Sequence, residues 1–191
     1  MEALIKKLES LSTATKSTID LLKSLFIKTE FKKGWMFGNG TWQSVPMLYY
    51  ISNGLVKGSV EHKDTSYMLW MLKNGFLIQS NGFFSQKGAN ETIEFLKHTQ
   101  AYVLNLVRVE KLAEADINLY KMLLEIYEEN LIESRNRELM LHIPNAKERL
   151  SYFVENNPEL QKAMTDDQVA QLLRIEKKYY YTVKRDLNGN L

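Results

Sequence analysis

Basic side chains capable of contacting nucleic acid gather near the C-terminus. Lys177, Lys178, Lys184 and Arg185 fall within residues 177–187, a predicted helix rich in tyrosine and lysine. Such side chains bind phosphates without reading base sequence, and the segment offers no clear candidate for base readout. Residues 141–191 carry 8 Lys/Arg against 7 Asp/Glu. The concentrated basic footprint of a dedicated nucleic-acid module is therefore missing.

A pair of short helices precedes and contains these basic residues. Thr165 and Gln168 have the spacing of a helix-start capping box, and an apolar face follows at 169–173. A turn at 174–176 then leads into the helix at 177–187, which makes a helix-turn-helix candidate. Gln168 is added to the possible DNA contacts because it lies near the helix start. Three consecutive tyrosines, 179–181, spread over about 200° of a helix, so packing is favoured over a stacking platform for single strands.

Residues for enzymatic or metal chemistry are sparse. The chain has no cysteine, which excludes thiolate metal sites, iron–sulfur ligation by cysteine and a cysteine nucleophile. His62, His98 and His142 lie far apart in the sequence, and none has a second ligand-type residue at a metal spacing. The carboxylates at 128, 129 and 133 fall on a charged helix, where a solvated face is the simplest interpretation. We expect no enzyme, no cofactor and no metal.

The remaining composition is that of a globular chain. It has 191 residues, 45% hydrophobic and 25% charged, and a net charge of +2. No apolar run approaches the roughly 18–20 residues of a membrane span, and the first residues lack the apolar stretch of a signal peptide. The expected location is the cytoplasm.

The pattern of apolar residues and turn residues predicts the elements that would position the basic C-terminal segment. Residues 2–27 form an amphipathic helical segment with a Ser/Thr-rich break, and residues 30–107 are mostly β. The runs 47–51 and 55–60 flank Ser52-Asn53-Gly54, which predicts a hairpin. Further strands are expected at 67–72, 92–96 and 102–107. The three tryptophans, all in this part, are expected in the core.

A helix without glycine or proline is predicted at 111–141. Its length favours packing against another long helix, such as a second copy of the chain, and Asn130 could set the register or simply be exposed. The apolar stripe that supports this helix consists of Leu112, Ala115, Leu119, Met122, Leu123 and Ile126.

This order of parts resembles the Crp/Fnr type of cyclic-nucleotide-binding transcription regulators over nearly the whole chain. Residues 31–34 with Gly40 look like the opening of the family's β-roll, and residues 48–56 resemble its "lyyI-x-sG-x-v" passage. Residues 91–96 and 102–104 are similar to the closing strands, and 146–150 with 157–160 to the passage before the DNA-reading helices. The resemblance implies an α+β fold with an N-terminal cyclic-nucleotide-binding-like β-roll (jelly roll), a long dimer helix and a C-terminal helix-turn-helix-like module.

Two departures from the family pattern bear on function. The stretch at 74–92, where the family's phosphate-binding cassette would lie, has neither its Gly-Glu pair nor its Arg. Without a guanidinium a cyclic phosphate loses its best partner, so cyclic AMP is not the expected ligand. Arg174 also replaces the turn glycine of the helix-turn-helix, where it must adopt that turn's backbone angles at some cost. The candidate ligand-pocket residues, taken from cassette position alone, are Phe76, Gln79, Ser80, Ser85, Gln86, Asn90 and Thr92.

The predicted organisation is a β-roll with an N-terminal helix at 1–110, a dimerisation helix at 111–141 and a helix-turn-helix-like domain at 142–191. The resemblance implies a homodimeric regulator in which an unknown small ligand in the roll biases the packing of the long helices and so repositions a DNA-binding tail. The alternative is a ligand-binding or protein-interaction module on the same scaffold that has lost DNA binding. The near-neutral tail and the missing turn glycine favour this alternative.

Overall fold

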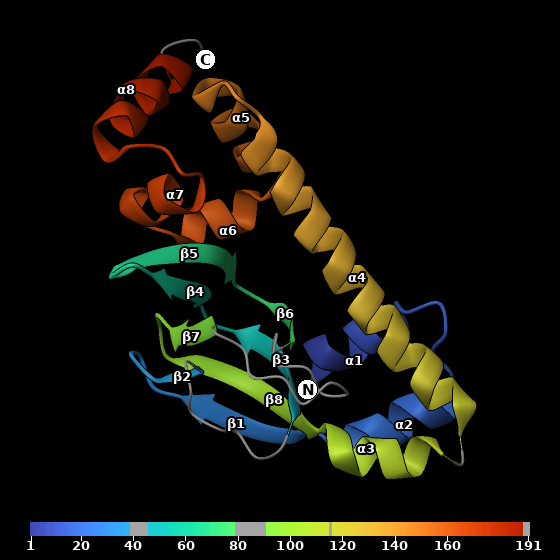
Figure 1. Ribbon diagram of the computed structural model, residues 1–191. Helices are drawn as coiled ribbons and strands as arrows, with labels where there is room; N and C mark the ends of the chain where they lie inside the picture. Colours follow the sequence, from blue (N-terminus) through green and yellow to red (C-terminus); the bar gives the residue numbers. More distant parts are fainter. Residues whose placement is uncertain (39–45, 79–90, 115, 189–191) are drawn as a thin grey trace.

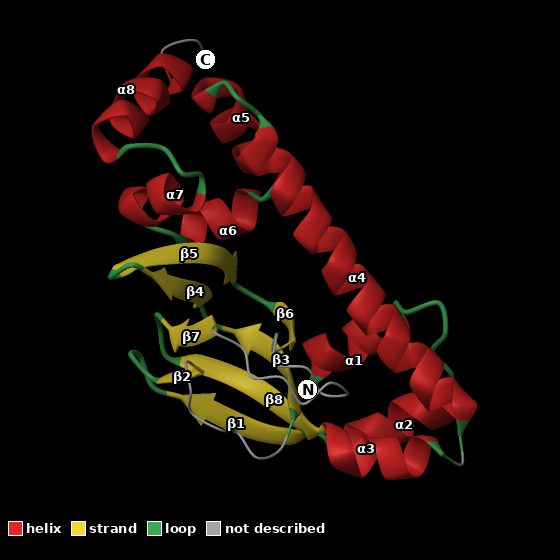
Figure 2. Cartoon of the chain, in the orientation of Figure 1, coloured by secondary structure: helices red, strands yellow, loops and turns green. Residues whose placement is uncertain are grey.

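The computed structural model is α+β and describes residues 1–38, 46–78, 91–114 and 116–188 (Figures 1 and 2). Two four-stranded antiparallel sheets face each other, with strand orders β1-β8-β3-β6 and β2-β7-β4-β5. The strands are β1 Ile27–Phe31, β2 Met36–Gly38, β3 Met47–Asn53, β4 Val56–His62, β5 Thr65–Leu72, β6 Gly75–Ile78, β7 Glu91–Phe95 and β8 Thr99–Asn105. The helices are α1 Glu2–Glu9, α2 Lys16–Leu25, α3 Leu106–Ala113, α4 Ile117–His142, α5 Ala146–Asn156, α6 Pro158–Ala163, α7 Asp166–Leu172 and α8 Lys177–Asn188.

The space between the sheets is filled by aromatic and branched side chains from both of them. Phe31 stacks on Phe95 with ring centroids 4.2 Å apart, and Phe37 stacks on Tyr49 at 5.5 Å. Phe95 and Ile51 are fully buried. Alternating inward-facing residues of this kind hold a sandwich together without disulfides.

The outer face of the first sheet is covered by helices. Leu4 and Leu8 of α1 and Leu22 of α2 are fully buried in one apolar cluster with Leu48 and Leu104 of the sheet. This burial explains the amphipathic pattern predicted for residues 2–27, which the structure divides into α1 and α2. The Thr15 side chain caps α2 by accepting a hydrogen bond from the Thr18 N–H.

The prediction of a hairpin around Ser52-Asn53-Gly54 is wrong. β3 pairs with β6 and β8, whereas β4 pairs with β5 and β7, so this segment connects the two sheets. Gly54 is needed here for space, because a Cβ at this position would overlap the Thr99 side chain. The hairpin lies between β4 and β5, where Lys63 and Asp64 both adopt positive φ, at 47° and 60°. That pair matches a two-residue type I′ turn.

The helix predicted at 111–141 is two helices in the structure. α3 ends at Ala113 and α4 begins at Ile117, with Asp116 accepting a hydrogen bond from the Asn118 N–H as its cap. Leu119, Met122 and Ile126 are buried against the N-terminal helices and the sheet of the same chain. This part of the predicted stripe is therefore intramolecular core. Ala115 lies outside the described residues.

The three tryptophans expected in the core differ in their outcome. The Trp70 ring is half-buried, and its Nε1–H donates to the Glu91 carboxylate. Trp35 is 56% exposed, which corrects the expectation for that residue, because it sits in the turn before β2. Trp42 lies outside the described residues.

Candidate functional site

α7 and α8 form the predicted helix-turn-helix unit at the end of the chain (Figure 1). The capping box at the start of α7 is confirmed. The Thr165 hydroxyl accepts from the Gln168 N–H at 3.3 Å, and the Gln168 Oε1 accepts from the Thr165 N–H at 2.8 Å. The Gln168 side chain, predicted as a possible DNA contact, is thus engaged in closing the helix start.

The turn between the two helices is a Schellman motif built without glycine. The Ile175 N–H donates to the Ala170 carbonyl at 2.9 Å, and the Arg174 N–H donates to the Gln171 carbonyl at 3.2 Å. Arg174 has a φ of 52°, so it adopts the left-handed conformation that glycine would take without strain. The cost for a residue with a Cβ is about 1 kcal/mol. Ile175 is buried behind the turn and helps offset this cost.

The three tyrosines of α8 differ in environment. Tyr180 is 1% exposed and packs with Phe153 and Val183 in the C-terminal core, whereas Tyr179 and Tyr181 are 53% and 46% exposed. Burial, together with the neighbouring Asp166, raises the pKa of Tyr180 above its usual value. Packing is confirmed for Tyr180. The other two leave their rings on the surface.

Two predicted phosphate contacts on α8 are held by carboxylates at the start of α7. Lys184 Nζ lies 2.6 Å from Asp166 Oδ1, and Lys177 Nζ lies 2.7 Å from Asp167 Oδ2. The hydrogen bond and charge of Asp167 raise the pKa of Lys177. Both ammonium groups are therefore partly neutralised within the unit.

The other two basic residues on α8 are differently placed. Lys178 is exposed and makes no hydrogen bond or ion pair with any described residue. Arg185 is exposed, with Nε 3.9 Å from the Asp186 carboxylate. The outer surface of α8 thus carries Lys178 and Arg185 beside the exposed rings of Tyr179 and Tyr181.

Asp166 and Asp167 are partners of the candidate lysines that the sequence did not reveal. They stand 18 and 10 positions before their lysine partners, so no local spacing connects them. Both occupy the first turn of α7, where the helix dipole favours acidic residues. The Thr-Asp-Asp sequence before a basic helix is the one signal that could have indicated them.

The structure describes only two of the predicted ligand-pocket residues. Phe76 in β6 is buried in the cluster beneath the N-terminal helices, edge-on to Tyr50 at 5.1 Å. Thr92 in β7 belongs to the other sheet, opposite Gly38 and Ser59. The remaining five lie outside the described residues: Gln79, Ser80, Ser85, Gln86 and Asn90.

The C-terminal unit packs on the edge strand β5, with α6 and α7 lying over it (Figure 1). Met71 of β5 shares an apolar cluster with Leu172 and Leu173. Lys73 Nζ lies 3.0 Å from the Glu159 carboxylate of α6, and Lys97 Nζ donates to the Ala163 carbonyl at 3.0 Å. These contacts set the position of the helix-turn-helix unit relative to the two sheets.

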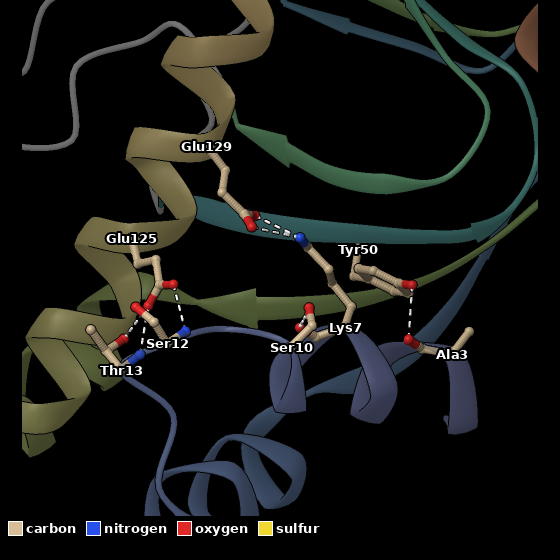
Figure 3. A network of polar contacts seen from close by, with 8 residues as sticks. All are labelled: Ala3, Lys7, Ser10, Ser12, Thr13, Tyr50, Glu125 and Glu129. Atoms are coloured by element: carbon tan, nitrogen blue, oxygen red, sulfur yellow. Dashed lines mark hydrogen bonds and ion pairs between the residues drawn. The ribbon is translucent and has the colours of Figure 1, made fainter. Parts of the chain in front are cut away.

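The first half of α4 is anchored to the N-terminal helices by two carboxylates (Figure 3). Glu125 accepts hydrogen bonds from the N–H groups of Ser12 and Thr13 at 2.6 and 2.8 Å, and from the Thr13 hydroxyl. Desolvation of Glu125 would raise its pKa, but these donors outweigh it and lower the pKa to about 2. Glu129 pairs with Lys7 at 2.7 Å.

The opposite face of α4 carries exposed apolar side chains at heptad spacing. Ile117, Leu124 and Leu131 are 63%, 66% and 58% exposed and follow one another at seven-residue steps. Ile132 and Leu139 are also exposed and repeat the same step. Five large apolar residues on one helix form a surface typical of association.

Among the described residues no group of three or more His, Asp or Glu side chains has metal-binding geometry. His62 and His142 are exposed, and His98 lies 3.4 Å from the Glu30 carboxylate. No helix in the described part of the chain has the length and apolar character needed to cross a membrane.

Comparison with known proteins gives a clear result for fold. No family model and no curated protein sequence matches the chain. Solved structures do match. CLP of Xanthomonas campestris, described as a c-di-GMP responsive global regulator, has 14% identity and a TM-score of 0.68, covering 92% of this chain and 93% of its own. FixK2 of Bradyrhizobium japonicum has 14% identity and a TM-score of 0.70, covering 86% and 85%.

A third similar structure is described as a transcriptional regulator of the crp/fnr family from Eubacterium rectale. It has 13% identity and a TM-score of 0.64, covering 93% of this chain and 85% of its own. The chain therefore has the α+β fold of the Crp/Fnr regulators, as the sequence resemblance implies. At this identity the likeness concerns the fold alone.

Proposed function

We propose that this chain, built on the Crp/Fnr fold, is a cytoplasmic transcriptional regulator that binds duplex DNA through α7 and α8. The observation that carries the proposal is the exposed surface of α8, which follows a helix-turn-helix turn and presents Lys178 and Arg185 to solvent. A second helix placed in this way can lie in the major groove while its basic residues contact phosphates. Lys177 and Lys184 add to this surface when phosphate displaces their carboxylate partners.

The regulator acts as a homodimer through the exposed face of α4. Its apolar residues repeat every seven positions, which suits a coiled-coil seam with a second copy. Replacing both Leu124 and Leu131 with glutamate should convert a dimer into a monomer in analytical ultracentrifugation. A matched variant at Val107 and Leu112, two exposed positions of α3, should remain dimeric. Monomeric native protein would contradict the dimer.

A small ligand bound in the β-roll would bias the packing of the two α4 helices and so reposition the DNA-binding pair. Cyclic AMP is not the expected ligand, because residues 74–92 contain no arginine to hold a cyclic phosphate. The seven residues predicted from cassette position remain the candidates for its pocket.

The proposal is tested by titrating fluorescent random-sequence duplex DNA with the purified chain at 50 and 200 mM salt. Binding should weaken steeply with salt, because each phosphate contact releases counterions. Lys178→Ala should weaken binding and reduce the salt slope by about 1, whereas Lys111→Ala on exposed α3 should change neither. A folded dimer with no affinity at the lower salt would support the interaction module instead.

A further inference from the structure

A cavity of about 470 Å³ opens where the three parts of the molecule meet. Its walls come from the turn between β5 and β6, from the second half of α4, and from the α5–α6 junction. A volume of this size is typical of small-molecule sites. All the residues that line it are described, and none is among the pocket residues predicted from the cassette position.

Two charged side chains on one wall have no hydrogen-bond partner among the described residues. Glu133 and Arg137 are four residues apart on α4, so they lie side by side on the helix surface. Neither makes a hydrogen bond or an ion pair within 4.0 Å with any described residue. Desolvation raises the pKa of Glu133 and lowers the pKa of Arg137. Glu133 is exposed at the mouth of the cavity and Arg137 is half-buried, so both can be reached by a ligand.

The other charges in the cavity are already paired. Lys73 and Glu159 lie 3.0 Å apart, and Glu159 also contacts Lys162 at 3.0 Å. The rest of the wall is amide or apolar except for Tyr152. Its apolar part consists of Met71, Leu72, Met140, Phe153, Pro158, Leu160 and Leu172. Glu133 and Arg137 are therefore the two charged groups of this wall that form no hydrogen bond or ion pair with a described residue, and they lie beside an apolar floor.

We propose that this cavity binds a zwitterion of the α-amino acid class with an apolar side chain. The guanidinium of Arg137 matches the ligand's carboxylate in a two-point contact, and the Glu133 carboxylate accepts from its ammonium group. In an α-amino acid the two charges are adjacent, as they are at i and i+4 on a helix. The apolar side chain lies against the methionine and leucine residues. Such a ligand contacts the sheets, the long helix and the C-terminal unit at once.

The first test is calorimetric titration of the full chain with L-phenylalanine as probe, up to about 10 mM. Two matched probes each lack one charge: 3-phenylpropanoate has no ammonium group and 2-phenylethylamine has no carboxylate. L-phenylalanine should bind saturably with a Kd of about 1 mM or tighter, and each matched probe should bind about tenfold more weakly or worse. Equal binding of all three, or no binding of L-phenylalanine, would overturn the proposal.

Variants assign the contact to the two residues. Arg137→Gln and Glu133→Gln should each weaken L-phenylalanine binding about tenfold or more. Arg135→Gln is the control, because Arg135 is exposed, pairs with Glu138 at 2.7 Å and does not line the cavity. If Arg137→Gln and Arg135→Gln bind the probe equally, Arg137 is not the receptor for its carboxylate.

A second measurement separates a ligand site from a structural charge. Glu91 and Glu133 both favour the charged form of Arg137, so the arginine could serve only to balance them. In that case Arg137→Gln would lower the urea midpoint of the ligand-free protein more than Arg135→Gln does. If Arg137 serves a ligand site, the urea midpoint of ligand-free Arg137→Gln should be no lower than that of ligand-free Arg135→Gln. Added L-phenylalanine should raise the midpoint of Arg135→Gln but not that of Arg137→Gln.

Discussion

Two sets of carboxylates hold helices together in this molecule, and they differ in what they bind. Glu125 of α4 accepts from the backbone N–H groups of Ser12 and Thr13, between α1 and α2 (Figure 3). Asp166 and Asp167 of α7 instead bind Lys184 and Lys177. Those two ammonium groups lie on the helix that we propose contacts DNA.

The difference lies in what can replace each carboxylate. In the proposed function no external anion binds the N–H groups of Ser12 and Thr13. The Glu125 contact therefore only stabilises the fold. A lysine ammonium binds phosphate as readily as carboxylate, and the two lysine pairs are partly exposed. In the proposed function, Asp166 and Asp167 therefore stabilise the free protein and oppose DNA binding, whereas Glu125 only stabilises.

The largest expected loss of stability comes from the apolar contacts between α4 and the N-terminal helices, beside Glu125. Leu119→Ala should lower the free energy of unfolding by about 2–5 kcal/mol, because Leu119 is fully buried between α4 and the N-terminal helices. Leu131→Ala, on the exposed face, should change it by no more than about 0.5 kcal/mol. Urea denaturation at a concentration that favours monomers measures both. Equal losses would show that the two faces of α4 are not distinct.

A smaller effect is expected from Glu125 itself. Its folded-state pKa of about 2 lies below the usual value of 4.5, so its stabilisation is present above pH 4.5 and is lost as the pH falls toward 2. Glu125→Gln should remove about 1 kcal/mol at neutral pH, after allowance for solvent screening, and flatten this part of the stability profile.

The matched control for this titration is Glu128→Gln, an exposed neighbour on the same helix. It should leave the acid limb of the profile unchanged. If the native protein and Glu125→Gln lose stability in parallel between pH 4.5 and 2, Glu125 does not supply this pH dependence.

The smallest effect is expected for the pair between Lys7 and Glu129. Their side chains are 32% and 38% exposed, so the pair should contribute less than about 1 kcal/mol. A double-mutant cycle with Lys7→Ala and Glu129→Ala in urea gives the coupling energy directly. A coupling energy well above 1 kcal/mol would mean that this ion pair anchors α4 as strongly as Glu125 does.

Local signals in the sequence were sufficient for the helix-turn-helix. The capping box at Thr165 and Gln168 and the apolar face of α7 depend on spacings of three and four residues, and both are as predicted. The strained backbone at Arg174 was also predictable, because the resemblance placed a glycine there.

Long-range pairing was not predictable in the same way. Asn53-Gly54 has a hairpin sequence, but Gly54 is required by the approach of Thr99 from β8, which no local pattern reveals. The true hairpin uses Lys63 and Asp64, a pair without the glycine that usually follows Asn or Asp in such a turn. α4 carries two apolar stripes, and the sequence alone does not say which one faces its own sheet.

The most direct test of the account compares the salt dependence of DNA binding with and without the α7 carboxylates. The double variant Asp166→Asn, Asp167→Asn should bind random duplex DNA more tightly than the native chain, with a log–log salt slope steeper by up to about 2, because two lysines are released to phosphate. The control Glu114→Gln, Glu128→Gln changes the net charge equally at two exposed positions, one directly after α3 and one on α4. Circular dichroism verifies the fold of each variant. If the double variant matches this control in affinity and slope, α8 does not contact DNA through these lysines, and the central claim is contradicted.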